Sequence, residues 1–114
     1  MKYSTVRTYA LSLPEATEAP HFTYQSFRVR DKIFVTVPPG EENIHIFLPE
    51  AQREQALALH LQFIEKLVWG KSVTGVRVTL ARAEAAVVKA LILAAWRHKA
   101  PKRLRDADCL VTPR

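Results

Sequence analysis

The chain has 114 residues, of which 48% are hydrophobic and 25% charged, a composition typical of one folded domain with its own core. This balance excludes wholesale disorder, and no apolar run approaches the roughly 18 residues that cross a bilayer, so we expect no membrane partner. The single cysteine, Cys109, cannot form an internal disulfide, which is typical of a cytoplasmic protein.

The net charge of +6 is distributed unevenly along the chain. Residues 1–65 contain six Lys or Arg and eight Asp or Glu, whereas residues 66–105 contain ten Lys or Arg and one acid, Glu84. Such an imbalance indicates a polyanionic or acidic partner. A soluble protein whose surface is merely basic is an alternative of similar weight.

The first part of the chain predicts a helix and then a loop. Ser4 is a suitable N-cap because its hydroxyl can accept a hydrogen bond from an early backbone N–H. Apolar residues then recur at helical spacing, and Pro14 ends the helix. Residues 15–20 are expected to form an acidic loop.

Residues 22–48 predict three strands in an antiparallel meander, on which the helices pack. β-branched and aromatic residues alternate with polar residues there, as they do in strands with one buried face. In the central strand, Ile33, Val35 and Val37 should share one face and Phe34 should lie on the other. Two turns separate the strands, at residues 30–32 and 38–42.

The second half begins with a helix from Pro49 to Ala58, since proline suits a first helical turn. Residues 61–69 either continue this helix or form a short irregular strand near 63–67, and we favour the strand. Residues 69–75 contain two glycines and predict a loop. A strand at 76–80 follows, because apolar and polar residues again alternate.

The last helix should run from Ala83 to His98 and stop before Pro101. Its broad apolar stripe is typical of a helix that packs on a sheet. Together these elements predict an α+β fold, an antiparallel sheet with helices packed on it, in one domain at residues 1–104. Residues 105–114 are expected to be a poorly ordered tail.

No pattern in the sequence indicates catalysis or metal binding. Gly70-Lys71-Ser72 would need a glycine at position 65 to form a phosphate-binding loop, but this residue is Glu65. The four histidines are widely spaced, and no serine has the frame of a nucleophile elbow. We therefore expect no enzyme activity, cofactor or metal. An enzyme acting on a small anionic substrate, with His21 or Lys71 in a pocket, is a less favoured alternative.

Three groups of cations are candidates for contacts with phosphate oxygens. They are Arg28, Arg30 and Lys32; Lys71 and Arg77; and Arg97, Lys99, Lys102, Arg103 and Arg105. The alternative is that such charges keep exposed strand edges from aggregating. This alternative explains the third group less well, because five cations fall within nine residues without an acid.

Several short motifs together resemble the YjbR/MmcQ family of small bacterial proteins. They are Leu13-Pro14, Pro20-His21-Phe22, Ser26-Phe27-Arg28-Val29, Lys32-Ile33-Phe34, Trp69-Gly70-Lys71 and the stretch from Ala95 to Leu104, AWRHKAPKRL. The resemblance implies an α+β fold with a double-wing arrangement of β-hairpins, from which DNA binding is inferred for the family. The chain departs from the family pattern at Val76, where a second tryptophan is expected after the glycine.

The leading hypothesis is a DNA-binding protein that contacts the phosphate backbone with little sequence specificity. The expected contacts are Arg28, Arg30, Lys71, Arg77, Lys99, Lys102 and Arg103. The alternative is a non-enzymatic protein-interaction module or homodimer that uses an exposed sheet face. Its basis is that Phe34 and Phe47 lie opposite the Ile and Val face, where one helix layer would leave them uncovered.

Overall fold

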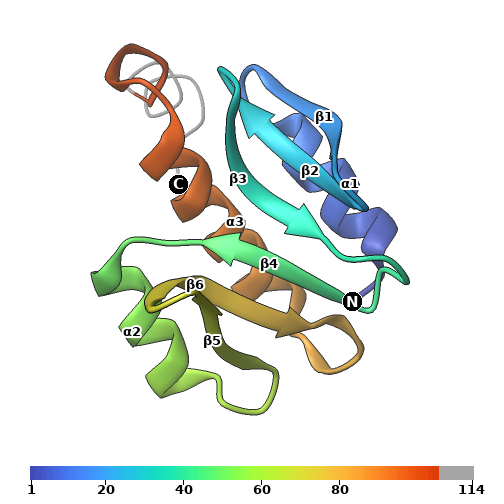
Figure 1. Ribbon diagram of the computed structural model, residues 1–114, viewed down its shortest axis with the longest axis vertical. Helices are drawn as coiled ribbons and strands as arrows, with labels where there is room; N and C mark the ends of the chain where they lie inside the picture. Colours follow the sequence, from blue (N-terminus) through green and yellow to red (C-terminus); the bar gives the residue numbers. More distant parts are fainter. Residues whose placement is uncertain (106–114) are drawn as a thin grey trace.

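The computed structural model describes residues 1–105 as a six-stranded antiparallel sheet with helices on one face (Figure 1). The elements in chain order are α1 (Tyr3–Ser12), β1 (Ala16–His21), β2 (Tyr24–Val29), β3 (Lys32–Val37), β4 (Asn43–Phe47), α2 (Glu50–Leu59), β5 (Ile64–Trp69), β6 (Ser72–Thr79), the 3-10 helix η1 (Leu80–Arg82) and α3 (Ala85–Lys99). The predicted α+β class is confirmed. Apart from Arg105, the expected tail lies outside the described residues.

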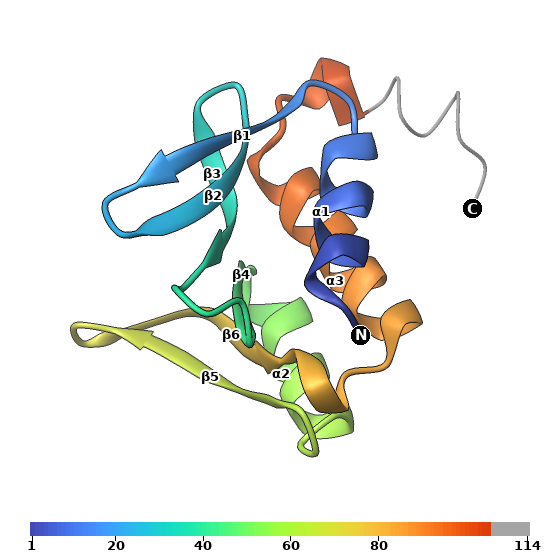
Figure 2. The same ribbon diagram turned by 90° about the vertical axis from the view of Figure 1, so that its right-hand side faces the viewer.

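The strands are ordered β1-β2-β3-β4-β6-β5, so the chain crosses over once, through α2, and returns with β6 between β4 and β5. This order places two hairpins, β1–β2 and β5–β6, at opposite edges of the sheet. Both hairpins project away from α1 and α3 (Figure 2). None of the helices among residues 1–105 has the length and apolar character needed to cross a membrane.

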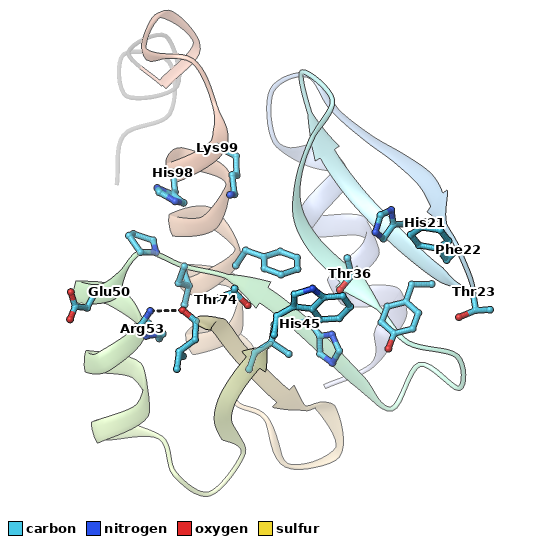
Figure 3. A pocket seen from close by; sticks show the side chains of 17 residues that line it. His21, Phe22, Thr23, Thr36, His45, Glu50, Arg53, Thr74, His98 and Lys99 are labelled. Carbon is cyan, nitrogen blue, oxygen red and sulfur yellow. Dashed lines mark hydrogen bonds between the residues drawn. The ribbon is translucent and has the colours of Figure 1, made fainter. Parts of the chain in front are cut away.

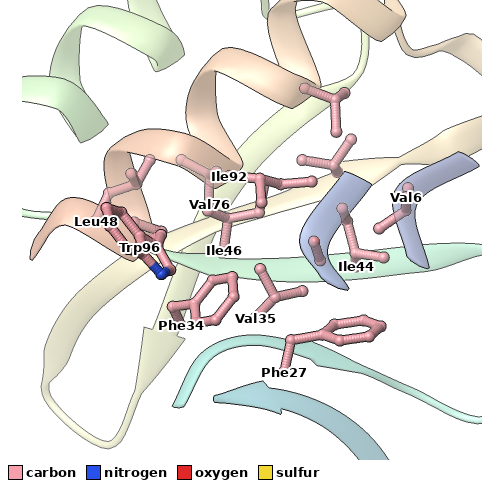
Figure 4. Packing of buried hydrophobic residues seen from close by; sticks show 14 of the residues in the cluster. Val6, Phe27, Phe34, Val35, Ile44, Ile46, Leu48, Val76, Ile92 and Trp96 are labelled. Carbon is pink, nitrogen blue, oxygen red and sulfur yellow. The ribbon is translucent and has the colours of Figure 1, made fainter. Parts of the chain in front are cut away.

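The core lies between the sheet and the helices, and Trp96 on α3 is its largest fully buried side chain (Figure 4). Ile44 and Ile46 of β4 and Val76 and Val78 of β6 face it with no exposed surface. Burial of each such side chain stabilises the fold by about 1.5–3 kcal/mol. The alternation predicted for β4 and β6 is therefore confirmed.

The prediction for Phe34 is wrong, because a β-bulge changes the register of β3. Phe27 pairs with Val35 and Arg28 with Ile33, which leaves Phe34 without a partner in the ladder. A bulge of this kind breaks the strict alternation of faces. Phe34 and Val35 are consequently both fully buried in the core (Figure 4).

Residues 15–20 do not form a loop; Ala16–His21 is the edge strand β1. Pro20 fits there because an edge strand has hydrogen-bonding neighbours on one side only. Ser4 is not an N-cap either, since α1 begins at Tyr3 and the N-cap Lys2 makes no side-chain capping bond. The end of α1 before Pro14 is as predicted.

Within residues 61–69, the favoured strand is present as β5, which begins at Ile64 and ends at Trp69, and α2 does not continue. The loop predicted at 69–75 is instead a tight turn at Gly70 and Lys71, followed directly by β6. Gly70 has a φ of 63°, which suits glycine, whereas Gly75 lies within the strand. A Cβ on Gly75 would lie 2.0 Å from the backbone oxygen of Ile46, so β4 and β6 approach closely only because this residue is glycine.

Candidate nucleic-acid interface

A cleft of about 670 Å³ lies over the face of the sheet that the helices leave uncovered. Side chains from both hairpins, from the central strands and from the ends of α2 and α3 surround it (Figure 3). The lining residues used below are Phe22, Tyr24, Thr36, His45, Phe47, Arg53, Trp69, Thr74, His98 and Lys99. They come from distant parts of the sequence and meet because the strand order brings the two hairpins to face one another.

The floor of the cleft follows from strand alternation. In β4 the core takes Ile44 and Ile46, so His45 and Phe47 face the opposite way, into the cleft. Tyr24 of β2 lies beside His45, with 5.9 Å between the ring centroids. Burial and then the nearby positive charge of Arg77 lower the pKa of His45 below its ordinary value of 6.5. The floor is therefore aromatic and carries a neutral imidazole at neutral pH.

The rim of the cleft carries the most exposed large apolar side chains of the two hairpins. Phe22 at the tip of β1–β2 is 93% exposed, and Trp69 at the end of β5 is 74% exposed. The Phe22 ring makes an edge contact with His21, with 4.8 Å between the centroids. Phe22 also has a φ of 57°, a left-handed backbone conformation that turns the chain sharply at this tip.

Three basic residues and one carboxylate, that of Glu50, lie at the end of the cleft formed by helix termini. His98 and Lys99 lie on the last turn of α3, and Arg53 lies on α2 (Figure 3). Arg53 is already bonded: it donates to the backbone oxygen of Val73 at 2.9 Å and pairs with Glu54. Burial, followed by the charges of Lys99 and Arg105, lowers the pKa of His98. Lys99 therefore supplies the positive charge that borders the cleft at this end.

Three of the seven expected DNA contacts, Arg28, Arg30 and Arg77, form ion pairs or hydrogen bonds with other residues of the protein. Arg30 forms a bidentate ion pair with Glu15. Arg30, followed by a smaller contribution from Arg103, lowers the pKa of that carboxyl. Arg77 lies 3.7 Å from the Glu65 carboxylate across β5 and β6.

Arg28 is bonded within the β1–β2 hairpin. Its Nε donates to the Ser26 hydroxyl at 3.0 Å, and its Nη2 donates to the backbone oxygen of Pro20 at 3.2 Å. Ser26 is fully buried and donates in turn to the oxygen of Ala19 at 2.7 Å. These bonds give Arg28 a structural role in joining the two strands.

The other four expected contacts, Lys71, Lys99, Lys102 and Arg103, form no ion pair with any described residue. Lys99 lines the cleft, and Lys102 and Arg103 follow it as exposed residues just beyond α3. Lys71 is exposed at the turn of the β5–β6 hairpin, two residues after Trp69. The structure thus places Lys99 at one end of the cleft, with Lys102 and Arg103 three and four residues further along the chain, and Lys71 on a hairpin tip.

Of the aromatic residues of the cleft, Phe47 was correctly predicted to lie on the uncovered face. Phe22 was predicted only as the start of a strand and Trp69 only as the start of a loop, and neither was predicted to line a cleft. Their exposure depends on hairpins that project beyond the sheet. His21 does line the cleft, whereas Lys71 is not among its lining residues. Within residues 1–105, no three His, Cys, Asp or Glu side chains converge in a metal-binding arrangement.

The fold and the cleft define a small α+β protein with two β-hairpins that flank an uncovered sheet face. The model of the YjbR family matches residues 11–98 of the chain, and the chain belongs to this family. Val76, where the sequence departs from the family pattern, is fully buried in the core. Val76 therefore faces the core and is not among the residues that line the cleft.

The fold is also similar to that of a solved structure. The crystal structure of Deinococcus radiodurans protein DR2400, described as a DUF419 domain, superposes with a TM-score of 0.75 at 17% sequence identity. The similarity covers 93% of this chain and 86% of that one. No curated protein matches the chain.

Proposed function

We propose that this protein binds DNA through contacts between exposed cations and the phosphate backbone. The main support for this proposal is that the basic last turn of α3 borders the cleft between the two hairpins. Lys99 lines that cleft, and Lys102 and Arg103 extend the positive charge beyond it. Lysine and arginine in such a position attract phosphates and release the counterions that surround DNA.

Four residues carry the proposal: Lys71, Lys99, Lys102 and Arg103. Arg28, Arg30 and Arg77 were equally good candidates by sequence, but their intramolecular bonds must weaken or be shared before they contact a phosphate. We therefore expect these three to contribute less to affinity. Ion pairs of exposed side chains are weak, so a reduced contribution is expected from Arg30 and Arg77 rather than none.

Little sequence specificity is expected. A recognition helix presents side chains to base edges in the major groove. On α3, by contrast, Val88, Ile92, Ala95 and Trp96 are fully buried against the sheet. Phosphate contacts position a protein on DNA but do not read its sequence.

The test is a titration of a fluorescently labelled DNA oligonucleotide at low salt. The charge-reversal variant Lys99→Glu, Lys102→Glu, Arg103→Glu should lose at least tenfold in affinity. The matched control is the triple variant Lys2→Glu, Arg82→Glu, Lys89→Glu, which changes the net charge by the same amount. These residues lie just before α1, on η1 and on α3, and none of them lines the cleft. If both variants lose affinity equally, net charge alone drives binding and the proposed interface is wrong.

Association with another protein, or with a second copy of the chain, is the second candidate. It is favoured by the exposure of Phe22, Val68 and Trp69, which are 93%, 55% and 74% exposed on the two hairpins. Exposed apolar side chains that gather on one face are typical of interaction surfaces. A dimeric mass in sedimentation at micromolar concentration would support this candidate, and a monomeric mass at high concentration would count against self-association.

A further inference from the structure

The lining of the cleft does not match the outside of a DNA duplex. Four aromatic side chains, Phe22, Tyr24, Phe47 and Trp69, line it together with His45. A duplex presents phosphates, sugars and the edges of base pairs, while its bases stack on each other inside. The flat faces of these aromatic residues therefore have no partner on a closed duplex.

Unpaired bases supply the missing partner. A base that has left the helix offers a flat π face, and proteins that hold single strands stack such bases on aromatic side chains. The cleft volume of about 670 Å³ lies within the range of pockets that enclose small molecules. The cleft thus has both the size and the surface that a flipped or single-stranded base requires.

The polar groups of the cleft fit the same ligand. His45 is half-buried and its pKa is lowered, so at neutral pH its ring can both donate and accept a hydrogen bond at a base edge. Thr36 lies beside His45 in the floor, and its hydroxyl is a second group that can both donate and accept a hydrogen bond (Figure 3). Neutral groups of this kind suit the uncharged edges of bases better than they suit phosphates.

The charges lie where the backbone of such a strand would run. Lys99 borders the cleft at one end, and Lys102 and Arg103 follow it in the sequence. Lys71 lies two residues after Trp69, at the turn of the β5–β6 hairpin. Aromatic platforms bordered by cations are the usual design of sites for single-stranded nucleic acid.

From this juxtaposition we propose that the cleft takes the unpaired bases of single-stranded DNA, with the aromatic side chains of the two hairpins stacking on them. The inference rests on the proposed function, since it assigns the phosphates of the same ligand to the cations at the rim. It adds a class of substrate: single-stranded DNA, or DNA with exposed bases, in preference to a closed duplex.

The experiment compares three ligands with equal phosphate numbers per strand: a 12-nucleotide oligothymidine, the duplex it forms with oligoadenine, and an abasic 12-mer. Tryptophan fluorescence gives a direct readout, because Trp69 is exposed while Trp96, the other tryptophan, is fully buried. We expect the single strand to quench the fluorescence and to bind at least tenfold more tightly than the duplex or the abasic strand.

Two variants test the stacking contact itself. Trp69→Ala should weaken binding of the single strand by about 5- to 150-fold, which corresponds to the stacking of one base on an aromatic ring. Trp69→Phe should retain most of the affinity. Leu59→Ala is the control, since Leu59 is also exposed, at 61%, but lies on α2 outside the cleft lining. Both positions are on the surface, so all three variants are expected to fold.

The outcomes separate this inference from the proposed function. Equal binding of the abasic and normal strands would overturn base stacking but leave phosphate binding intact. Preference for the duplex would overturn the inference in the same way. Absence of binding to all three ligands would overturn both proposals. If the wild-type protein is a dimer and Trp69→Ala is a monomer, the cleft binds a second copy of the chain, and the inference is overturned.

Discussion

Trp96 and Pro14 are joined by a hydrogen bond of 3.0 Å from the indole Nε1 to the backbone oxygen, across 82 residues of sequence. The bond fixes α3 to the chain just after α1, beneath the sheet. The indole ring is fully buried, so both its apolar surface and its single donor are used. α3 in turn carries Lys99 to the end of the cleft.

Replacing this side chain should therefore destabilise the fold strongly. Trp96→Phe removes the donor and leaves a space in the core, and we expect a loss of about 2–4 kcal/mol in the free energy of unfolding. Urea denaturation measures it. Trp69→Phe is the matched control and should change stability by no more than about 0.5 kcal/mol, because Trp69 is exposed. Similar losses in the two variants would contradict the assigned packing.

Gly75 should not tolerate a side chain. In Gly75→Ala the new Cβ would meet the Ile46 oxygen at 2.0 Å, which forces β4 and β6 apart and costs about 3 kcal/mol or more. Gly70→Ala provides the comparison. Nothing lies within 4 Å of a Cβ there, so only its positive φ is strained, at about 1–2 kcal/mol. If Gly70→Ala proves the more damaging change, the strand contact is misassigned.

His45 should titrate below 6.5 in the folded protein. The unfolded chain then binds the proton more readily, so stability is lost as the pH falls through 6.5 towards the folded pKa, and it is unaffected above that range. NMR titration of the ring gives the pKa directly. Arg77→Gln should raise the pKa only in part, since burial is the larger cause. A wild-type pKa at or above 6.5 would be inconsistent with a half-buried ring in the cleft.

The contacts of Arg28 predict a role in stability rather than in binding. Ser26→Ala removes the acceptor of Arg28 and the donor to Ala19, and should cost about 1–3 kcal/mol in urea denaturation. Arg28→Gln should change affinity for DNA less than twofold, whereas Lys99→Gln should weaken it several-fold. An Arg28 variant that is stable but fails to bind DNA would contradict this assignment and show that Arg28 contacts DNA.

The fold was predictable where alternation is unbroken, as in β4, where every second residue enters the core. It was not predictable at β1, because Pro20 and two glutamates resemble a loop and the strand is held by β2, Arg7 and Ser26. Phe34 shows a further limit. A bulge is set by the pairing of two strands, so the sequence of one strand cannot reveal it.

The candidate site was predictable only as a charge imbalance. Arg28 and Arg30 looked equivalent to Lys99 in sequence, and only the positions of Ser26 and Glu15 distinguish them. The cleft depends on the crossover that places β6 between β4 and β5, so Trp69 and the residues of β4 face a common space. Such convergence comes from strand order, which local patterns do not contain.

The most direct test of DNA binding is the salt dependence of the affinity of the unmodified protein for a short oligonucleotide. If the four cations each contact a phosphate, log K should fall against log salt concentration with a slope of about −2.8 for a single strand or about −3.6 for a duplex. The variant with Lys99, Lys102 and Arg103 replaced by glutamate should show a slope near −1. No measurable binding at low salt, or a slope that this variant leaves unchanged, would contradict the account.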